Sequence, residues 1–296
     1  MKQIIKSCSV YNAEFPKDVD LEAALEESKF VDLLATQQLS IGFVKRDEFG
    51  TYVEKFAGGT CFTLRVDQKL VSAALVNSQL KERMKDIEAL TGRKVGKKER
   101  RELRLETLEA LLAITPGQTT NIITCFHHTE SNMLLVPSTS QRLCDRITSA
   151  LVHAIDSLKT QTIHVSNVKS GLTNRLRDWL DGKDSFADLY PVNFVGLDLS
   201  NLRVSMKLSD LINASGGLKE ALSQGFSVKS LGLKMLSGTD VRLSDDFKLS
   251  ALSFAHPPVE GDDDLFLAEA TLEVDEIVSF VNQLCEMFGY EEPAEA

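Results

Sequence analysis

The segment TGRKVGKKERRELR, residues 91–104, gathers positive charge in an acidic chain. It holds seven Lys or Arg and two Glu, a local net charge of +5, whereas the 296-residue chain has a formal net charge of −10. Cations at this density can contact the phosphates of nucleic acid, although a solvated helix surface explains such a charge run about as well. The seven cations are Arg93, Lys94, Lys97, Lys98, Arg100, Arg101 and Arg104.

This basic segment offers charge without any device for reading bases. It contains no aromatic residue that could stack on a base. The chain also lacks a zinc-finger pattern and a recognition-helix signature. Any binding to DNA should therefore ignore base sequence and weaken strongly with salt.

Two predicted strands carry further candidate cations. In LRVSMKL, Arg203, Ser205 and Lys207 share one strand face, and Lys229 and Lys234 flank LGL in a later strand. The simplest interpretation is the polar face of a half-buried strand. If these faces line the same concavity as the basic segment, Lys207 and Lys229 extend its track of phosphate contacts.

Catalytic chemistry has one candidate, the cluster Asp262, Asp263 and Asp264. Such acids could hold magnesium in a nuclease, but capping and the helix dipole explain acids that directly precede a predicted helix. His127 and His128 are neighbours on a predicted strand, so they point to opposite faces and suit no shared metal. The sequence has no Walker phosphate loop and no serine-hydrolase elbow. We expect no enzyme activity, no cofactor and no metal.

Composition places the chain among ordinary globular proteins, with 43% hydrophobic and 26% charged residues. The five cysteines are scattered and form no C-x-x-C pair, which favours a reducing compartment. No apolar run approaches the roughly 20 residues of a membrane helix, and the N-terminus does not resemble a signal peptide. These features predict a cytoplasmic protein without a membrane segment.

The basic segment lies in a predicted helical hairpin. Val76, Leu80, Met84, Ile87 and Leu90 follow helical spacing up to a break at Thr91-Gly92, and a second helix is predicted from about residue 97 to residue 114. Pro and Gly then end the second helix. On this second helix an apolar row is expected on the same face as the cations and nearer the root of the hairpin. The charge therefore lies at the tip. That row is Leu105, Leu108 and Leu112.

Short runs of predicted strands interrupted by helices favour an α+β fold with mixed antiparallel sheets. We expect residues 1–71 and 118–160 to form a first lobe, and residues 72–117 to form a projecting basic hairpin. Residues 161–296 would form a second lobe that ends in a long helix.

Several short motifs follow one another along the chain. They are Gly42-Phe43-Val44, Lys69-Leu70-Val71, Arg93-Lys94 and Lys97-Lys98, and longer segments of note are LTNRLRDWLDG, ALSQGFSVKSLGLKM and VRLSDDFKLSALSF. In these motifs the chain resembles the RdgC family of bacterial recombination-associated proteins. The order of segments is collinear with that family over nearly the whole chain, although Lys45-Arg46 and Ser72-Ala73 stand where the family has prolines.

The resemblance implies horseshoe-shaped subunits that pair into a ring-shaped homodimer around duplex DNA, with the hairpin as a gate. It also implies antagonism of a RecA-type recombinase and association with the nucleoid. The seven cations of the basic segment, together with Lys207 and Lys229, would then face the hole of the ring.

We therefore expect a non-enzymatic protein that binds double-stranded DNA without regard to sequence and restrains recombination. Two alternatives remain open. One is a metal-dependent nuclease that uses the cluster at residues 262–264, and the other is an adaptor whose hairpin docks on an acidic protein.

Overall fold

The computed structural model describes residues 3–47, 49–163, 165, 168–199, 202–207, 215–256 and 265–290. This part of the chain forms seven helices and twelve strands, which confirms the expected α+β class. No helix in these ranges is both long and apolar enough to cross a membrane. All five cysteines lie within them, and none forms a disulfide.

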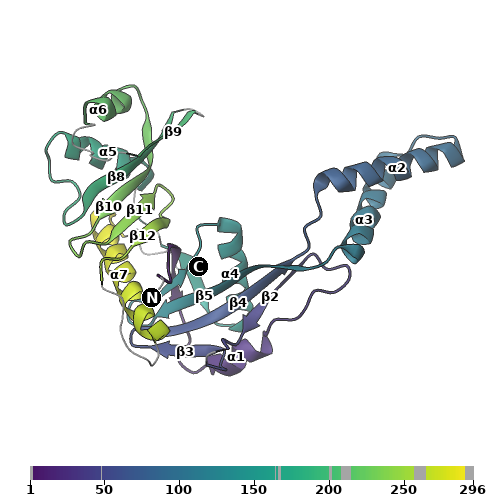
Figure 1. Cartoon of the computed structure of the whole chain (residues 1–296), viewed down its shortest axis with the longest axis horizontal. Helices are drawn as coiled ribbons and strands as arrows, with labels where there is room; N and C mark the ends of the chain where they lie inside the picture. Colours follow the sequence, from purple (N-terminus) through teal and green to yellow (C-terminus); the bar gives the residue numbers. More distant parts are fainter. Residues whose placement is uncertain are drawn as a thin grey trace. The chain divides into compact units, whose positions relative to one another are not determined.

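The strands pair in the order β2-β4-β5-β6-β1-β12-β11-β10-β8-β9, with β3 on β4 and β7 on β1 (Figure 1). The strand pairings that the structure describes are antiparallel. The strands are β1 (Ser7–Glu14), β2 (Leu39–Val44), β3 (Val53–Phe56), β4 (Gly59–Gln68), β5 (Gln118–His128), β6 (Met133–Val136), β7 (Lys159–Thr162), β8 (Tyr190–Leu199), β9 (Leu202–Lys207), β10 (Ser227–Lys234), β11 (Asp240–Ser244) and β12 (Leu249–Ser253).

The chain divides into two compact units. The first unit comprises Met1–Leu21, Val53–Phe62 and Thr124–Ala296, and the second comprises Glu22–Tyr52 and Thr63–Ile123. The lobe boundaries expected from the sequence, at residues 71, 117 and 160, stay predictions.

The first unit has its main core between its strands and three of the four helices that the structure describes there. The helix α7 (Leu265–Phe288) buries a regular row of apolar side chains, because spacings of three and four residues return to the same helix face. This row joins strand residues such as Leu231 and Leu243 in one continuous core. Burying each such side chain contributes about 1.5–3 kcal/mol. The other helices are α4 (Gln141–Ala154), α5 (Val168–Leu180) and α6 (Ser215–Ser223).

A buried carboxylate on α7 also holds the start of the chain. Glu273 is fully buried, and its two oxygens accept hydrogen bonds from the backbone N–H groups of Ile4 (2.9 Å) and Ile5 (2.6 Å). Burial raises the pKa of Glu273, while the two N–H donors oppose that rise. The contact fixes the residues that lead into β1.

The second unit contains the predicted hairpin. After α1 (Leu21–Glu27) and β2, the chain leaves β4 at Gln68 and forms α2 (Ala73–Thr91) and α3 (Lys97–Ile114), then returns through β5. Ser72 caps α2 by accepting the N–H of Leu75 at 3.2 Å. Gly92 ends α2 in the left-handed conformation, with φ 65°.

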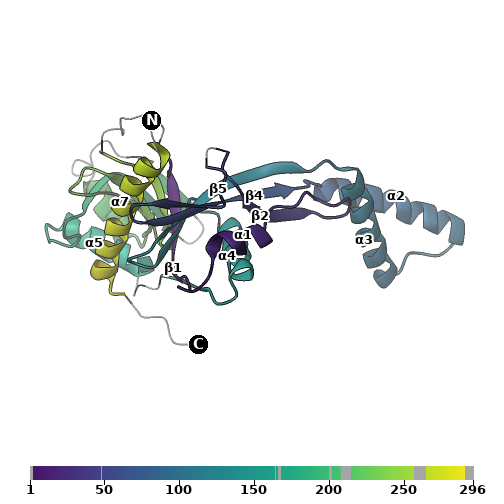
Figure 2. The same cartoon turned by 90° about the horizontal axis from the view of Figure 1, so that it is seen from below.

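The hairpin helices contact each other mainly at their root, where α2 begins and α3 ends. Figure 2 shows α2 and α3 close together at this root and apart toward their far ends. Val76 and Leu80 of α2 are buried, as are Leu111 and Leu112 of α3. The root therefore supplies the apolar packing that holds the pair together.

Two leucines at apolar helical spacings, one on each helix of the hairpin, are exposed. Leu90 is 87% exposed and Leu105 is 56% exposed, and Thr107 is buried in place of Leu105. Helical spacing aligns residues on a face, but burial also needs a neighbouring surface. Beyond the root the two helices diverge, so no such surface covers these leucines.

Candidate nucleic-acid interface

The turn at residues 92–96 is held by two carboxylates. Glu88 in the last turns of α2 accepts the backbone N–H of Val95 through Oε1 at 3.1 Å. Glu99 in the first turn of α3 accepts the N–H of Gly96 at 3.4 Å. These contacts fix the path of the chain between the helices, so the cations around the turn have defined positions.

One cation of the basic segment is already neutralised. Arg93 donates two hydrogen bonds to the carboxylate of Glu99, at 2.8 and 3.0 Å. Hydrogen bonding to Arg93 lowers the pKa of Glu99 below its usual range. Arg93 therefore helps to hold the turn, and it offers less charge to a ligand than the sequence suggested.

The other six cations of the segment are exposed to solvent and form no ion pair with any residue that the structure describes. Lys94 lies in the turn and five cations lie on α3. At about 100° per residue, those five fall within an arc of about 160° on the helix. Glu102, Glu106 and Glu109 fall outside this arc, beyond the edge marked by Lys98. The hairpin thus presents one cationic face.

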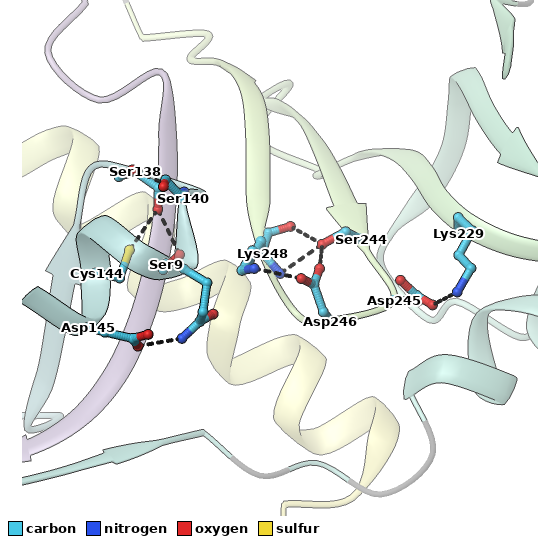
Figure 3. A network of polar contacts seen from close by, with 11 residues as sticks. Ser9, Ser138, Ser140, Cys144, Asp145, Lys229, Ser244, Asp245, Asp246 and Lys248 are labelled. Carbon is cyan, nitrogen blue, oxygen red and sulfur yellow. Dashed lines mark hydrogen bonds and ion pairs between the residues drawn. The ribbon is translucent and has the colours of Figure 1, made fainter. Parts of the chain in front are cut away.

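The strand cations of the first unit have a different environment. Figure 3 shows Lys229 of β10 directed at Asp245, with Nζ 2.7 Å from Oδ2. Lys234 at the end of β10 lies 3.7 Å from Asp240. Lys207 pairs with Phe194 in the ladder of β8 and β9, but its side chain lies outside the described residues. Lys229 thus has its charge balanced by a neighbouring carboxylate.

Histidines and acids form no metal site in the described ranges, where no group of three or more His, Cys, Asp or Glu is arranged to hold an ion. His127 is buried and its Nε2 lies 3.1 Å from the carbonyl oxygen of Ala13, while His128 contacts Ser131 through Nδ1 at 2.8 Å. The two rings thus have separate partners. The cluster at residues 262–264 lies outside the described residues.

Sequence reasoning missed two residues that shape this interface. Glu99 pairs with Arg93, and its position three residues after the N-cap Gly96 is a local signal that could have revealed a role in the turn. Lys69 is buried at the hairpin root, where it contacts three backbone carbonyls. No local pattern predicts those contacts, because all three partners lie more than 30 residues away. Leu34 and Ala35 precede Lys69 in the chain, and Leu112 follows it.

The fold and this surface define an α+β protein with a basic helical hairpin. A family model described as "Putative exonuclease, RdgC" matches residues 4–291. The chain therefore belongs to the RdgC family, as its motifs indicated.

Curated relatives share this length and carry the name "Recombination-associated protein RdgC". The chain is 25% identical over 295 residues to the protein of Pseudoalteromonas atlantica, covering 93% of each chain. It is 26% identical over 304 residues to that of Dechloromonas aromatica, covering 97% of each. It is 28% identical over 296 residues to that of Laribacter hongkongensis, covering 94% of this chain and 95% of the relative.

Proposed function

We propose that this protein binds double-stranded DNA without regard to sequence and acts in homologous recombination, without catalysis of its own. The observation that carries the proposal is the set of six exposed cations on the hairpin, none of which has a carboxylate partner among the described residues. The relatives named recombination-associated proteins favour DNA as the polyanion that these cations meet.

The arrangement of charge on α3 supports a role in binding anions rather than in stability. Lys97, Lys98, Arg100 and Arg101 occupy the first turns of α3, where the helix dipole disfavours cations. Glu99 offsets only part of this repulsion. A phosphate near the same helix end is attracted both by the dipole and by the side chains.

The mechanism is electrostatic. Each phosphate that a Lys or Arg neutralises releases condensed counterions, so the binding constant falls as salt rises. For Z contacted phosphates, log K falls against log salt concentration with a slope of about −0.9Z. Glu102, Glu106 and Glu109 lie outside the arc of the cations on α3, so that arc can approach DNA without an acid within it.

At the level of the assembly, we propose a homodimer that closes around or occupies the duplex, with the hairpin near the contact between subunits. Occupied DNA would be less accessible to a RecA-type recombinase, and the protein would act at the nucleoid. The resemblance of the sequence to the family and the basic hairpin support this arrangement.

The decisive experiment reverses charge at Lys97, Lys98, Arg100 and Arg101 to Glu. We expect duplex affinity to fall equally for unrelated sequences and the salt slope to shrink by up to about 3.6. A matched control reverses the exposed Lys17, Lys29, Lys55 and Lys159, which changes the net charge by the same amount. Equal losses in both variants, or none in the hairpin variant, would contradict the proposal.

Two further measurements address the assembly and the recombinase. The mass in solution should be that of a dimer. Strand exchange by a purified RecA-type recombinase should slow as the protein saturates the duplex, and the hairpin variant should not slow it. A monomer that still slows strand exchange would rule out the ring.

A second candidate function is a magnesium-dependent exonuclease, which the name "Putative exonuclease, RdgC" of the matching family favours. Incubation of labelled linear duplex with the protein and magnesium distinguishes the exonuclease from a DNA-binding protein without catalysis. We expect intact DNA. Degradation that is lost in Asp263→Ala would instead establish the enzyme.

A further inference from the structure

Lys69 is a buried cation at the point where the hairpin joins its unit. It is 5% exposed, and its Nζ donates to the carbonyl oxygens of Leu34 at 3.0 Å, Leu112 at 2.9 Å and Ala35. Its backbone N–H donates to the carbonyl of Gln38 at 2.9 Å. No carboxylate pairs with Lys69 among the described residues.

The geometry satisfies a buried ammonium completely. Lysine has three N–H donors, and here three carbonyl oxygens accept them. Burial of a charge without such partners would be strongly unfavourable. The carbonyl of Leu112 lies in the last turn of α3, where unpaired carbonyls carry the negative end of the helix dipole. Lys69 is thus the cation that this helix end favours.

The segment contacted by Lys69 crosses the hairpin root and is itself held in place. Ser40 Oγ donates to the carbonyl of Val31, and the N–H of Gln37 donates to the carbonyl of Leu34 at 3.1 Å. Gly117, just after α3, lies so close to Leu33 that a Cβ at Gly117 would be 2.8 Å from Leu33 Cδ1. Lys69 therefore joins the end of α3 to an ordered part of the unit.

Orientation at this root is magnified along α3. Leu112 and Lys97 are 15 residues apart, which is about 22 Å of helix. A tilt of about 10° at the root moves the cations near Lys97 by about 4 Å, which is the whole reach of an ion pair. A small change in the orientation of α3 at Lys69 therefore displaces the cations of the face, most of all those near Lys97.

We propose that Lys69 is the positioning residue that holds the cationic face of the hairpin in the orientation that meets DNA, without touching DNA itself. This inference rests on the proposed DNA binding. In this proposal Lys69 acts by orienting α3, whereas the exposed cations act by contact with phosphates.

The test compares Lys69→Met with Lys29→Met, which removes the same charge from an exposed position of the same unit. Amide hydrogen exchange in the last turn of α3 should rise about tenfold or more in Lys69→Met and stay unchanged in Lys29→Met. Lys69→Arg keeps charge and donors and should restore most of the protection. Unchanged exchange in Lys69→Met would overturn the proposal.

Duplex titrations complete the test. We expect Lys69→Met to lose about fivefold or more in affinity and more than about 0.9 in salt slope, which exceeds the loss of one direct phosphate contact. Lys29→Met should change affinity by less than about twofold. A Lys69→Met titration that matches Lys29→Met would overturn the positioning role. If Lys69→Met does not fold, Lys69→Gln takes its place in both measurements.

Failure of the proposed function has a different signature. If the unaltered protein binds no duplex at low salt, DNA binding is wrong and the positioning role falls with it. The exchange measurement then still decides whether Lys69 anchors α3.

Discussion

Arg93 and Glu99 form a two-point ion pair across the turn of the hairpin, with nitrogen–oxygen distances of 2.8 and 3.0 Å. The same carboxylate accepts the N–H of Gly96. The pair thus holds the turn in shape and withdraws one cation from the basic face. Removing the charge of the Glu99 carboxylate tests whether Arg93 can also contact DNA.

Glu99→Gln should release Arg93 for contact with phosphate. We expect duplex affinity at low salt to rise and the magnitude of the salt slope to increase by about 0.9, because one more cation becomes available. Glu102→Gln makes the same change of charge at a position of α3 outside the arc of the cations, and it frees no such partner. It should raise affinity slightly and leave the slope unchanged. A slope that stays constant in Glu99→Gln would show that Arg93 serves the turn alone.

Lys229 should contribute less to DNA binding than Arg101. Lys229 is already paired with Asp245 at 2.7 Å, so a phosphate would have to displace a carboxylate. Lys229→Ala should therefore change the salt slope by less than half of the change in Arg101→Ala. Salt titrations of both variants on one duplex measure this. An equal change would mean that Lys229 exchanges its partner for DNA.

The buried ring of His127 should make stability depend on pH. Burial lowers the pKa of His127 to about 4, from an ordinary value of 6.5. The folded state therefore favours the neutral ring, and the unfolded chain takes up the proton first as pH falls. The stabilisation is complete above pH 6.5 and is lost between there and pH 4. The loss from pH 7.5 to pH 5 is about 2 kcal/mol.

Urea unfolding at these two pH values tests this expectation. His127→Gln should remove most of the difference in the free energy of unfolding between pH 7.5 and pH 5. His153→Gln, at an exposed position of α4, should keep that difference. A pH dependence that is unaltered in His127→Gln would assign the effect to other groups.

Gly59 should tolerate no side chain. A Cβ on this residue would lie 1.9 Å from the carbonyl oxygen of His127, and backbone cannot give way as a flexible side chain can. Gly59→Ala should destabilise the protein by about 2–3 kcal/mol. Gly217 in α6 has open space around its Cβ position, so Gly217→Ala should stabilise by about 0.5–1 kcal/mol. Urea midpoints compare the two, and equal effects would contradict the packing at Gly59.

The sequence alone predicted the elements of the hairpin well. Helices expected up to about residue 90 and from 97 to 114 are present as α2 and α3. Helical periodicity, the Ser72 cap and the stops at Gly92 and Pro116 act between residues a few positions apart. The density of cations in residues 91–104 is likewise a local property, and the motifs sufficed to indicate the family.

Tertiary structure decided which of these residues are buried, paired or exposed. Leu90 and Leu105 fit the apolar spacing but meet no covering surface. Lys229 is paired by Asp245, 16 residues away, and Lys69 is held by carbonyls 35 and 43 residues away in opposite directions along the chain. Periodicity reports on neighbours within a turn or two, whereas desolvation and ion pairing depend on which distant segments the fold brings together. For that reason the charge of the hairpin could be foreseen from the sequence, while the contacts that orient it could not.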